Sequence, residues 1–376
     1  MGGRARVLVV FGTRPEAIKM APVVAQLRKR PEVFETIVAV TAQHRDMLDQ
    51  VLRVFHISPD YDLDIMRPGQ TLAEITTRGL SGLSPLVETL RPDAMLVQGD
   101  TTTTFAAALA AFYHRVPVGH VEAGLRTNDP YLPFPEEGNR RLTTRLARWH
   151  FAPTFSSRAN LLREGVEPAS IHVTGNTVVD ALLEAAEAPY DFPPGTIADA
   201  LHSGRRIVLV TAHRRENWGT PFRAICAAIA TIARMHPDVH ILFATHSNPI
   251  VADVAEEVLG GLARVDLIGP QDYLPFVQLM KLATLIISDS GGVQEEAPTF
   301  GRPTLVMRDV TERPEAIEAG VARLVGTDAG RIVAEASRLL TQPDAYNEMA
   351  RRDNPFGDGR AAERIVDVLG RDIQSR

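Results

Sequence analysis

The sequence predicts an α/β protein of two Rossmann-like domains with a cleft between them. Apolar runs of strand length alternate with longer amphipathic segments, which is typical of a mostly parallel sheet covered by helices. This alternation breaks at residues 185–206, which contain three prolines and two glycines, and then starts again. A chain of 376 residues with 45% hydrophobic residues is long enough for two domains. We therefore expect one domain at residues 1–185 and a second at 206–355.

In the first half, four short apolar runs are predicted to be strands and the amphipathic segments to be helices. The expected strands are Val7–Phe11, Thr36–Val40, Ala94–Val97 and Pro117–Val121. The expected helices are Pro15–Arg28, Arg45–Phe55, Leu72–Leu90 and Thr101–His114.

The second half repeats the pattern. Its expected strands are Ile207–Thr211, His240–Ala244, Val265–Ile268, Leu282–Ile287 and Thr304–Met307. Helices are expected between them, one of them at Val293–Phe300, and the segment NPFGDG at 354–359 should interrupt the chain before a last helix, Arg360–Asp372.

Composition excludes several classes of protein. A net charge of −6 gives no basic footprint for nucleic acid. The single cysteine, Cys226, rules out a disulfide framework and is expected to pack as a small buried residue. The eleven histidines are scattered, so no metal site is expected, and the absence of a G-x-G-x-x-G motif argues against a dinucleotide cofactor. No apolar run reaches the ~20 residues of a membrane span, so we expect a cytoplasmic protein.

The stretch Ser288–Glu296, SDSGGVQEE, lies between a predicted strand and a predicted helix. Ser290, Gly291 and Gly292 should therefore lie at a helix N-terminus, where free N–H groups and the helix dipole favour an anion. The two glycines let a phosphate approach the backbone closely. Glu296, one turn further on, could accept hydrogen bonds from a ribose diol. This pattern predicts a nucleotide-diphosphate site, and an ordinary glycine-rich turn is the alternative.

Cations suited to a phosphate follow the first strand, where Arg14 and Lys19 occur in FGTRPEAIK. The pentapeptide RPEAI occurs again at 313–317, so Arg313 also begins a predicted helix. The carboxyl ends of parallel strands line the binding crevice of such sheets. Both arginines could therefore point into one cleft, or they could be ordinary surface charges.

Three carboxylates could carry proton chemistry at the same edge. Asp100 and Glu122 each follow a predicted strand, and Glu136 lies in the first turn of a helix that Pro135 can start. Each also has a structural explanation, as a helix N-cap, a solvated loop residue and a partner of the helix dipole. If they converge, repulsion should raise the pKa of at least one and create a proton donor beside an acceptor. His213, at the end of the second domain's first strand, is a candidate acid or base.

In this order, the motifs resemble those of the non-hydrolysing UDP-N-acetylglucosamine 2-epimerases. The resemblance spans both halves and rests on GTRPEAIKMAP, TAQHRDMLDQV, QGDT, HVEAGLRT, PEEGNRR, HRREN, DYLPFVQLM, SDSGGVQEEAP, RDVTERPEA and NPFGDG. It implies the glycosyltransferase-B fold, no cofactor and usually a homodimer. It also implies interconversion of UDP-GlcNAc and UDP-ManNAc for bacterial surface polysaccharides. The first domain, completed by the C-terminal helix 360–376, would lie on the sugar side, and the second would bind UDP.

The resemblance also assigns roles. The residues expected at the diphosphate are Ser290, Gly291, Gly292, Arg14, Lys19 and Arg313. Glu296 would hold the ribose, and Gln271 and Phe276 the uracil. The expected catalytic residues are Asp100, Glu122, Glu136 and His213. Many members bind a second UDP-GlcNAc as an activator, and the matching positions here are Gln43, Glu136, Arg214 and His246.

The residue types suit an elimination. The C2 proton of a GlcNAc unit has no adjacent carbonyl, so simple deprotonation is too difficult. A carboxylate would instead remove this proton as UDP leaves C1, and UDP would then add back to 2-acetamidoglucal while a proton returns from the opposite face. The alternatives are a hydrolysing epimerase that releases ManNAc and UDP, a glycosyltransferase of the same fold and a non-catalytic nucleotide-sugar sensor.

Overall fold

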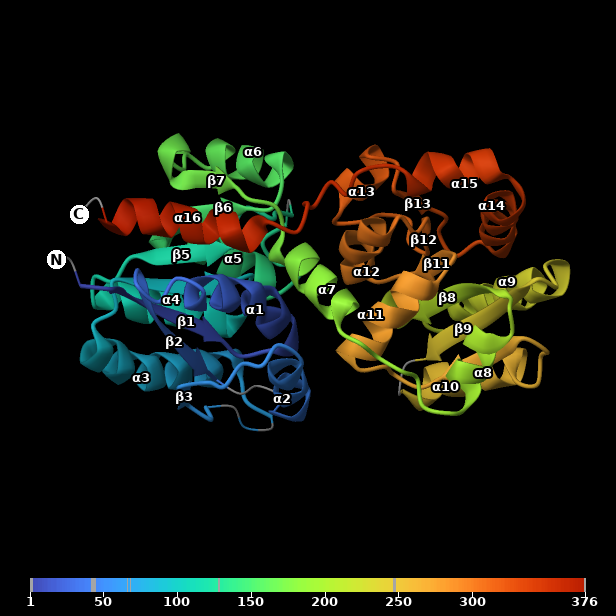
Figure 1. Cartoon of the computed structure of the whole chain (residues 1–376), viewed down its shortest axis with the longest axis horizontal. Helices are drawn as coiled ribbons and strands as arrows, with labels where there is room; N and C mark the ends of the chain where they lie inside the picture. The colour runs from blue at the N-terminus through green and yellow to red at the C-terminus, as the bar shows by residue number, and fades with distance from the viewer. Residues whose placement is uncertain are drawn as a thin grey trace. The chain divides into compact units, whose positions relative to one another are not determined.

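The structure is a computed structural model that describes residues 3–41, 45–65, 67, 69–127, 129–245 and 248–374. The chain forms two compact units, one of residues 1–181 and 356–376 and the other of residues 182–355. Each unit contains one parallel sheet with helices packed on it (Figure 1). The predicted fold class, two Rossmann-like α/β domains, is therefore confirmed.

The first unit has a seven-stranded sheet in the order β3-β2-β1-β4-β5-β6-β7, and all neighbouring strands are parallel. The strands are β1 (Ala5–Phe11), β2 (Phe34–Val40), β3 (Tyr61–Asp62), β4 (Ala94–Gln98), β5 (Val118–Val121), β6 (Trp149–Ala152) and β7 (Ile171–Val173). The four predicted strands are present. The strands β3, β6 and β7 were not predicted because they are short, and because His150 and His172 interrupt the apolar runs of β6 and β7.

Helices of the first unit pack in two groups. α3, α4 and α5 lie side by side, and α1 packs against α2 and α16 (Figure 1). Their bounds are α1 (Arg14–Arg28), α2 (Arg45–Val54), α3 (Leu72–Leu90), α4 (Thr102–Tyr113), α5 (Glu136–Leu146), α6 (Phe155–Arg163) and α16 (Ala361–Gln374). A single 3₁₀ turn, η1, covers Pro168–Ser170. α7 (Thr177–Glu187) contains the boundary between the units.

The C-terminal segment is fixed to the first unit by hydrogen bonds. Asp180 accepts from the backbone N–H groups of Ala361 and Ala362 at 3.2 and 2.8 Å, which caps the N-terminus of α16. The N–H of Asn176 donates to the carbonyl of Phe356 at 2.6 Å. The last helix of the chain, α16, therefore packs on the sheet of the first unit, whose strands all lie between Ala5 and Val173.

The second unit has a six-stranded parallel sheet in the order β10-β9-β8-β11-β12-β13. The strands are β8 (Arg206–Ala212), β9 (Val239–Thr245), β10 (Val265–Ile268), β11 (Leu285–Ser288), β12 (Thr304–Val306) and β13 (Ala322–Leu324). The helices are α8 (Thr196–His202), α9 (Thr220–Met235), α10 (Pro249–Leu259), α11 (Tyr273–Leu282), α12 (Gly291–Glu296), α13 (Pro314–Glu318), α14 (Ala329–Thr341) and α15 (Pro343–Ala350), with 3₁₀ turns η2 (Arg215–Asn217) and η3 (Ala297–Phe300). Its five predicted strands are present.

Two predicted boundaries in this unit are wrong. The strand expected at Leu282–Ile287 begins at Leu285, and Leu282 ends α11. Because the end of α11 is itself apolar, hydropathy gives no sign of the boundary. The helix expected at Val293–Phe300 begins at Gly291 and changes into η3 at Ala297. Pro298 has no N–H to donate, so the regular α-helical hydrogen bonding is interrupted there.

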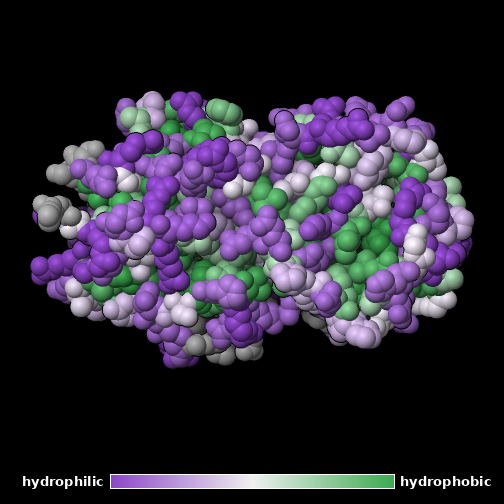
Figure 2. All heavy atoms as spheres, in the orientation of Figure 1, coloured by the Kyte–Doolittle hydropathy of each residue, from purple (hydrophilic) through white to green (hydrophobic). Residues whose placement is uncertain are grey.

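Core and surface follow the expected pattern. Cys226 is fully buried in the apolar core of the second unit, and burial raises the pKa of its thiol to about 12, as expected for an inert packed residue. The face of the molecule in Figure 2 is mainly hydrophilic, with small apolar areas. Among the described residues, no helix combines the length and the apolar composition that a bilayer span requires.

Candidate functional site

Site residues of the first unit follow three neighbouring strands. The sheet order reverses between β1 and β4, since β2 lies on the other side of β1 and β5 on the other side of β4. Arg14 follows β1, Asp100 follows β4 and Glu122 follows β5. In open α/β sheets, ligands bind outside the carboxyl ends of the strands at such a reversal.

Glu16 joins the turn after β1 to the turn after β4. Glu16 is 2% exposed, and its carboxylate accepts hydrogen bonds from the N–H groups of Gly12 and Thr13 at 3.0 and 2.7 Å. It also accepts from the hydroxyls of Thr101 and Thr104 at 2.7 and 3.0 Å. Burial raises the pKa of Glu16 despite these bonds. Glu16 in the RPEAI motif therefore does more than start a helix.

Asp100 forms an ion pair with Arg140 of α5, with Oδ2 at 2.7 Å from Nη2 and 2.9 Å from Nε. Its carbonyl accepts a hydrogen bond from Asn139 at 2.9 Å. The N-cap of α4 is Thr101, whose hydroxyl accepts from the N–H of Thr104. The alternative that Asp100 is the cap is therefore wrong, and its carboxylate is paired with Arg140 at the strand end.

His120 supports the turn that carries Asp100. It is fully buried on β5, and its Nε2 lies 2.7 Å from the carbonyl oxygen of Gly99. Burial lowers the pKa of His120 to about 3, so the imidazole is neutral and donates its Nε2 proton to that carbonyl.

Glu122 is 8% exposed and has a left-handed backbone with φ of 65°. Its Oε2 forms an ion pair with the ammonium of Lys19 and accepts a hydrogen bond from Gln98 at 3.0 Å. Lys19, which was expected at a diphosphate, thus contacts a carboxylate in this structure. The first unit therefore brings together two acid–cation pairs at one sheet edge, Asp100–Arg140 and Glu122–Lys19.

Gly124 allows the turn after Glu122 to pass close to α6. Its φ is 93°, and an added Cβ would lie 2.4 Å from the carbonyl oxygen of Ser157 and 2.9 Å from Leu161 Cγ. We expect Gly124→Ala to lower the free energy of unfolding by about 2–4 kcal/mol, measured by urea denaturation followed by circular dichroism. Gly165→Ala is the control, since Gly165 also has positive φ but open space at Cβ, and should cost only about 1 kcal/mol. Equal losses of unfolding free energy in both variants would show that the surrounding structure adjusts to the added Cβ at Gly124 without extra cost.

Glu136 begins α5 and is partly buried. Its Oε2 is buried and has no hydrogen-bond partner among the described residues, an arrangement that usually costs stability. The next residue, Glu137, is fully buried and pairs with Arg140 and Arg141 at 3.0 and 2.8 Å. Glu137 is therefore a structural residue, whereas Oε2 of the adjacent Glu136 can still accept a hydrogen bond.

In the second unit, the sheet order reverses between β8 and β11, and the glycine-rich turn follows β11. Ser290 is the N-cap of α12, and Gly291 and Gly292 are its first two residues. His213 and Arg214 follow β8. The structure therefore has the strand, glycine-rich turn and helix start that the sequence predicts.

Two guanidinium groups lie beside Gly291. A Cβ added to Gly291 would lie 3.4 Å from Arg313 Cζ and 3.6 Å from Arg214 Nη2. Arg313 Nε donates to Oε1 of Glu295 at 2.8 Å, and Glu295 is 2% exposed. Arg214, which was expected at an activator site, thus lies at the glycine-rich turn. A helix N-terminus with two adjacent guanidiniums is a suitable site for a phosphate.

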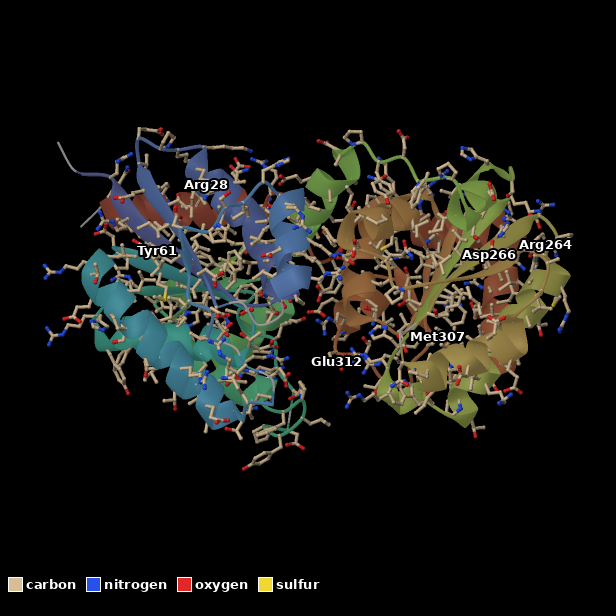
Figure 3. The ribbon with its side chains drawn as sticks, turned by 90° about the horizontal axis from the view of Figure 1, so that it is seen from below. Arg28, Tyr61, Arg264, Asp266, Met307 and Glu312 are labelled. Atoms are coloured by element: carbon tan, nitrogen blue, oxygen red, sulfur yellow. The ribbon has the colours of Figure 1, made fainter. Side chains whose placement is uncertain are left out.

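A second ion-pair group stabilises the same region. Arg308 donates to both carboxylate oxygens of Glu312 at 2.6 and 3.0 Å and lies 3.1 Å from Oε1 of Glu216. Burial alone would raise the pKa of Glu312, but the Arg308 guanidinium, helped by Arg214, holds it at about 2. Figure 3 shows Glu312 and Met307 in this unit.

Three further predicted site residues lie on other segments of the second unit. Gln271 follows β10 and donates to the carbonyl of Gly269 at 2.8 Å, and Phe276 is half-buried in α11. Glu296 ends α12 and is half-buried. Gln43 and His246 lie outside the described residues.

Sequence reasoning missed several residues that hold the site together, namely Asp289, Glu295, Glu16 and Arg140. Asp289 and Glu295 both lie within the SDSGGVQEE stretch, so their closeness in sequence to the two glycines could have indicated that they belong to the site. The contact of Arg140 with Asp100 spans 40 positions and has no local signal.

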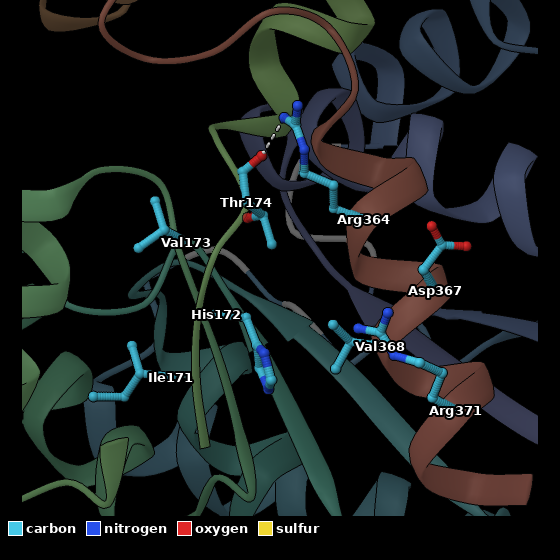
Figure 4. A pocket seen from close by; sticks show the side chains of 8 residues that line it. All are labelled: Ile171, His172, Val173, Thr174, Arg364, Asp367, Val368 and Arg371. Carbon is cyan, nitrogen blue, oxygen red and sulfur yellow. Dashed lines mark hydrogen bonds between the residues drawn. The ribbon is translucent and has the colours of Figure 1, made fainter. Parts of the chain in front are cut away.

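No group of three or more metal-ligating side chains occurs within the described part of the chain. A pocket elsewhere in the first unit is lined by β7 and α16, where Arg364 Nη1 donates to the carbonyl of Thr174 at 3.0 Å (Figure 4). This pocket contains none of the predicted site residues.

Comparison with known proteins identifies the family. The sequence model of a family described as UDP-N-acetylglucosamine 2-epimerase matches residues 25–370. The UDP-N-acetylglucosamine 2-epimerase of Yersinia pestis is 57% identical, over 97% of this chain and 98% of that protein. The one from Escherichia coli K12 is 56% identical, with the same coverage.

A solved structure agrees. The UDP-GlcNAc 2-epimerase from Neisseria meningitidis bound to UDP-GlcNAc has a TM-score of 0.86 and 49% sequence identity. The match covers 97% of this chain and 99% of that chain. The chain therefore belongs to the UDP-N-acetylglucosamine 2-epimerase family.

Proposed function

We propose that this chain interconverts UDP-GlcNAc and UDP-ManNAc by inverting C2 of the sugar without net hydrolysis. The observation that carries the proposal is that the two units have different charged groups at their strand ends. The first unit supplies carboxylates held by cations, and the second supplies two guanidiniums beside a glycine-rich helix start. The relative from Neisseria meningitidis, solved with UDP-GlcNAc, supports this nucleotide sugar as the substrate.

The proposed reaction is an elimination followed by an addition. One carboxylate takes the C2 proton while the C1–O bond breaks and its electron pair stays on the phosphate oxygen, which gives 2-acetamidoglucal and UDP. UDP then adds back as a proton returns to the opposite face of C2. Asp100 and Glu122 share these transfers: one takes the C2 proton as a carboxylate, and the other, as a carboxylic acid, returns a proton to the opposite face, while Arg140 and Lys19 hold the two side chains in place.

The diphosphate is proposed to lie on the second unit. Ser290, Gly291 and Gly292 provide backbone N–H groups, and Arg313 and Arg214 provide charge for the oxygens that gain it as the C1–O bond breaks. Arg14 adds charge from the first unit, Glu296 holds the ribose, and Gln271 and Phe276 hold the uracil. The product would serve the synthesis of surface polysaccharide.

Proton NMR of the protein with UDP-GlcNAc in D2O, without added cofactor, tests the proposal. We expect UDP-ManNAc to appear with deuterium at C2, because the abstracted proton exchanges with solvent. Free ManNAc and UDP as the only products would replace this proposal by a hydrolysing epimerase. UDP-ManNAc that keeps its original C2 proton would argue against proton abstraction.

A further inference from the structure

Asp289 is a buried carboxylate between β11 and the glycine-rich turn, and no role for it was predicted from the sequence. It is 0% exposed. Its oxygens accept from the backbone N–H of His213 at 3.0 and 3.1 Å, from that of Arg214 at 2.9 Å and from Asn217 Nδ2 at 3.0 Å. Its Oδ1 also lies 3.1 Å from Nδ1 of the His213 ring. One carboxylate thus accepts hydrogen bonds from three residues of the loop after β8.

The chemistry of these partners indicates that Asp289 is ionised and which ring nitrogen of His213 carries a proton. The two backbone N–H groups and the Asn217 amide nitrogen can only donate, so Asp289 is in its acceptor form, the ionised carboxylate. Burial would raise the pKa of Asp289, but the contact with His213 and the two N–H groups lower it below its ordinary value. A nitrogen 3.1 Å from this carboxylate must carry a proton, so the His213 proton lies on Nδ1.

A proton on Nδ1 also determines what the opposite ring nitrogen, Nε2, can do. In the neutral imidazole Nε2 has a lone pair, and in the imidazolium it has a proton to donate. The side chain of His213 is 44% exposed, in contrast to the buried Asp289, so one edge of the ring is fixed and the rest is accessible. Arg214 follows β8 and Gly291 follows β11, and the guanidinium groups of Arg214 and Arg313 lie beside Gly291.

We propose that Asp289 is a positioning residue that holds His213 with its proton on Nδ1, so that Nε2 faces the departing diphosphate. This inference rests on the proposed function. With Nδ1–H held by Asp289, the ring takes up a second proton from solvent at Nε2 before the C1–O bond breaks. As this bond breaks, its electron pair goes to the phosphate oxygen, and the imidazolium transfers the Nε2 proton to that oxygen. The proton returns to the imidazole when the C1–O bond forms again, so the cycle consumes no net proton.

A purely structural role is the competing explanation, because Asp289 also anchors the loop. A substitution of Asn217 distinguishes this structural role from the proposed positioning of His213. Asn217 Nδ2 donates to Asp289 at 3.0 Å and to the carbonyl of Met307 at 3.3 Å, and neither hydrogen bond involves the His213 ring. Asn217→Ala therefore weakens the anchor and leaves the ring contact, whereas Asp289→Asn keeps the size of the side chain and removes its charge.

The first test reads the tautomer directly by NMR on ¹⁵N-histidine-labelled protein without ligand. The His213 signal is the one absent from the His213→Asn variant. We expect the proton on Nδ1 in the wild-type protein and in Asn217→Ala, and on Nε2 or divided between both nitrogens in Asp289→Asn. A wild-type proton on Nε2, or an unchanged signal in Asp289→Asn, would overturn the proposal.

The second test is a double-mutant cycle in the epimerase assay. Asp289→Asn should lower kcat by about 10- to 100-fold with little change in KM, and adding it to His213→Asn should cost less than about 3-fold more. Losses that multiply would mean that Asp289 acts independently of His213. If the wild-type protein has no epimerase activity, the proposed function fails, and the tautomer, which needs no substrate, decides this inference by itself.

Discussion

Replacing Asp100 by Asn, or Glu122 by Gln, is expected to lower kcat by about 100- to 10,000-fold, the usual contribution of general acid–base catalysis. Both replacements keep the size of the side chain and an oxygen for the neighbouring cation, Arg140 or Lys19. Each removes the carboxylate that we propose to exchange a proton with C2. The measurement is the steady-state rate of UDP-ManNAc formation.

Glu88→Gln is the matched control, because Glu88 is an exposed glutamate on α3. It should keep the wild-type kcat. Thermal unfolding of all variants checks that the fold is retained. If Asp100→Asn and Glu122→Gln both keep near-normal rates, the assignment of proton transfer to these residues is wrong.

Arg313→Ala is expected to weaken UDP binding by about 100-fold or more, roughly 3 kcal/mol. Arg313 lies beside Gly291, so the change removes a charged donor from the proposed phosphate site. It also removes this cation from the nearly buried Glu295, which makes the place where a diphosphate should bind more negative. Isothermal titration calorimetry with UDP measures the effect.

The control is Arg323→Ala in the same unit. Arg323 forms an exposed ion pair with Glu335 at 2.9 Å, on β13 and α14. Exposed pairs contribute little, so UDP affinity should change by less than about 3-fold. A similar loss in both variants would mean that net charge, and not the position of Arg313, controls UDP binding.

Much of the fold could be predicted from the sequence because its signals are local. Strands such as Val7–Phe11 are buried on both faces and are therefore continuous apolar runs. Boundaries failed where neighbouring elements share this apolar character, as at Leu282. The short strands β6 and β7 were missed because each is three or four residues long and contains a histidine.

The sequence by itself determined which residues follow the strands, and hence that Asp100, Glu122, His213 and the glycine-rich turn lie at carboxyl edges of parallel sheets. That conclusion needs only hydrophobic pattern and turn chemistry. Only the tertiary structure decided their partners, since Lys19 and Glu122 are 103 positions apart and His213 and Asp289 are 76 apart. Strand order brings these loops together, and strand order depends on the packing of whole helices and strands, which local sequence does not encode.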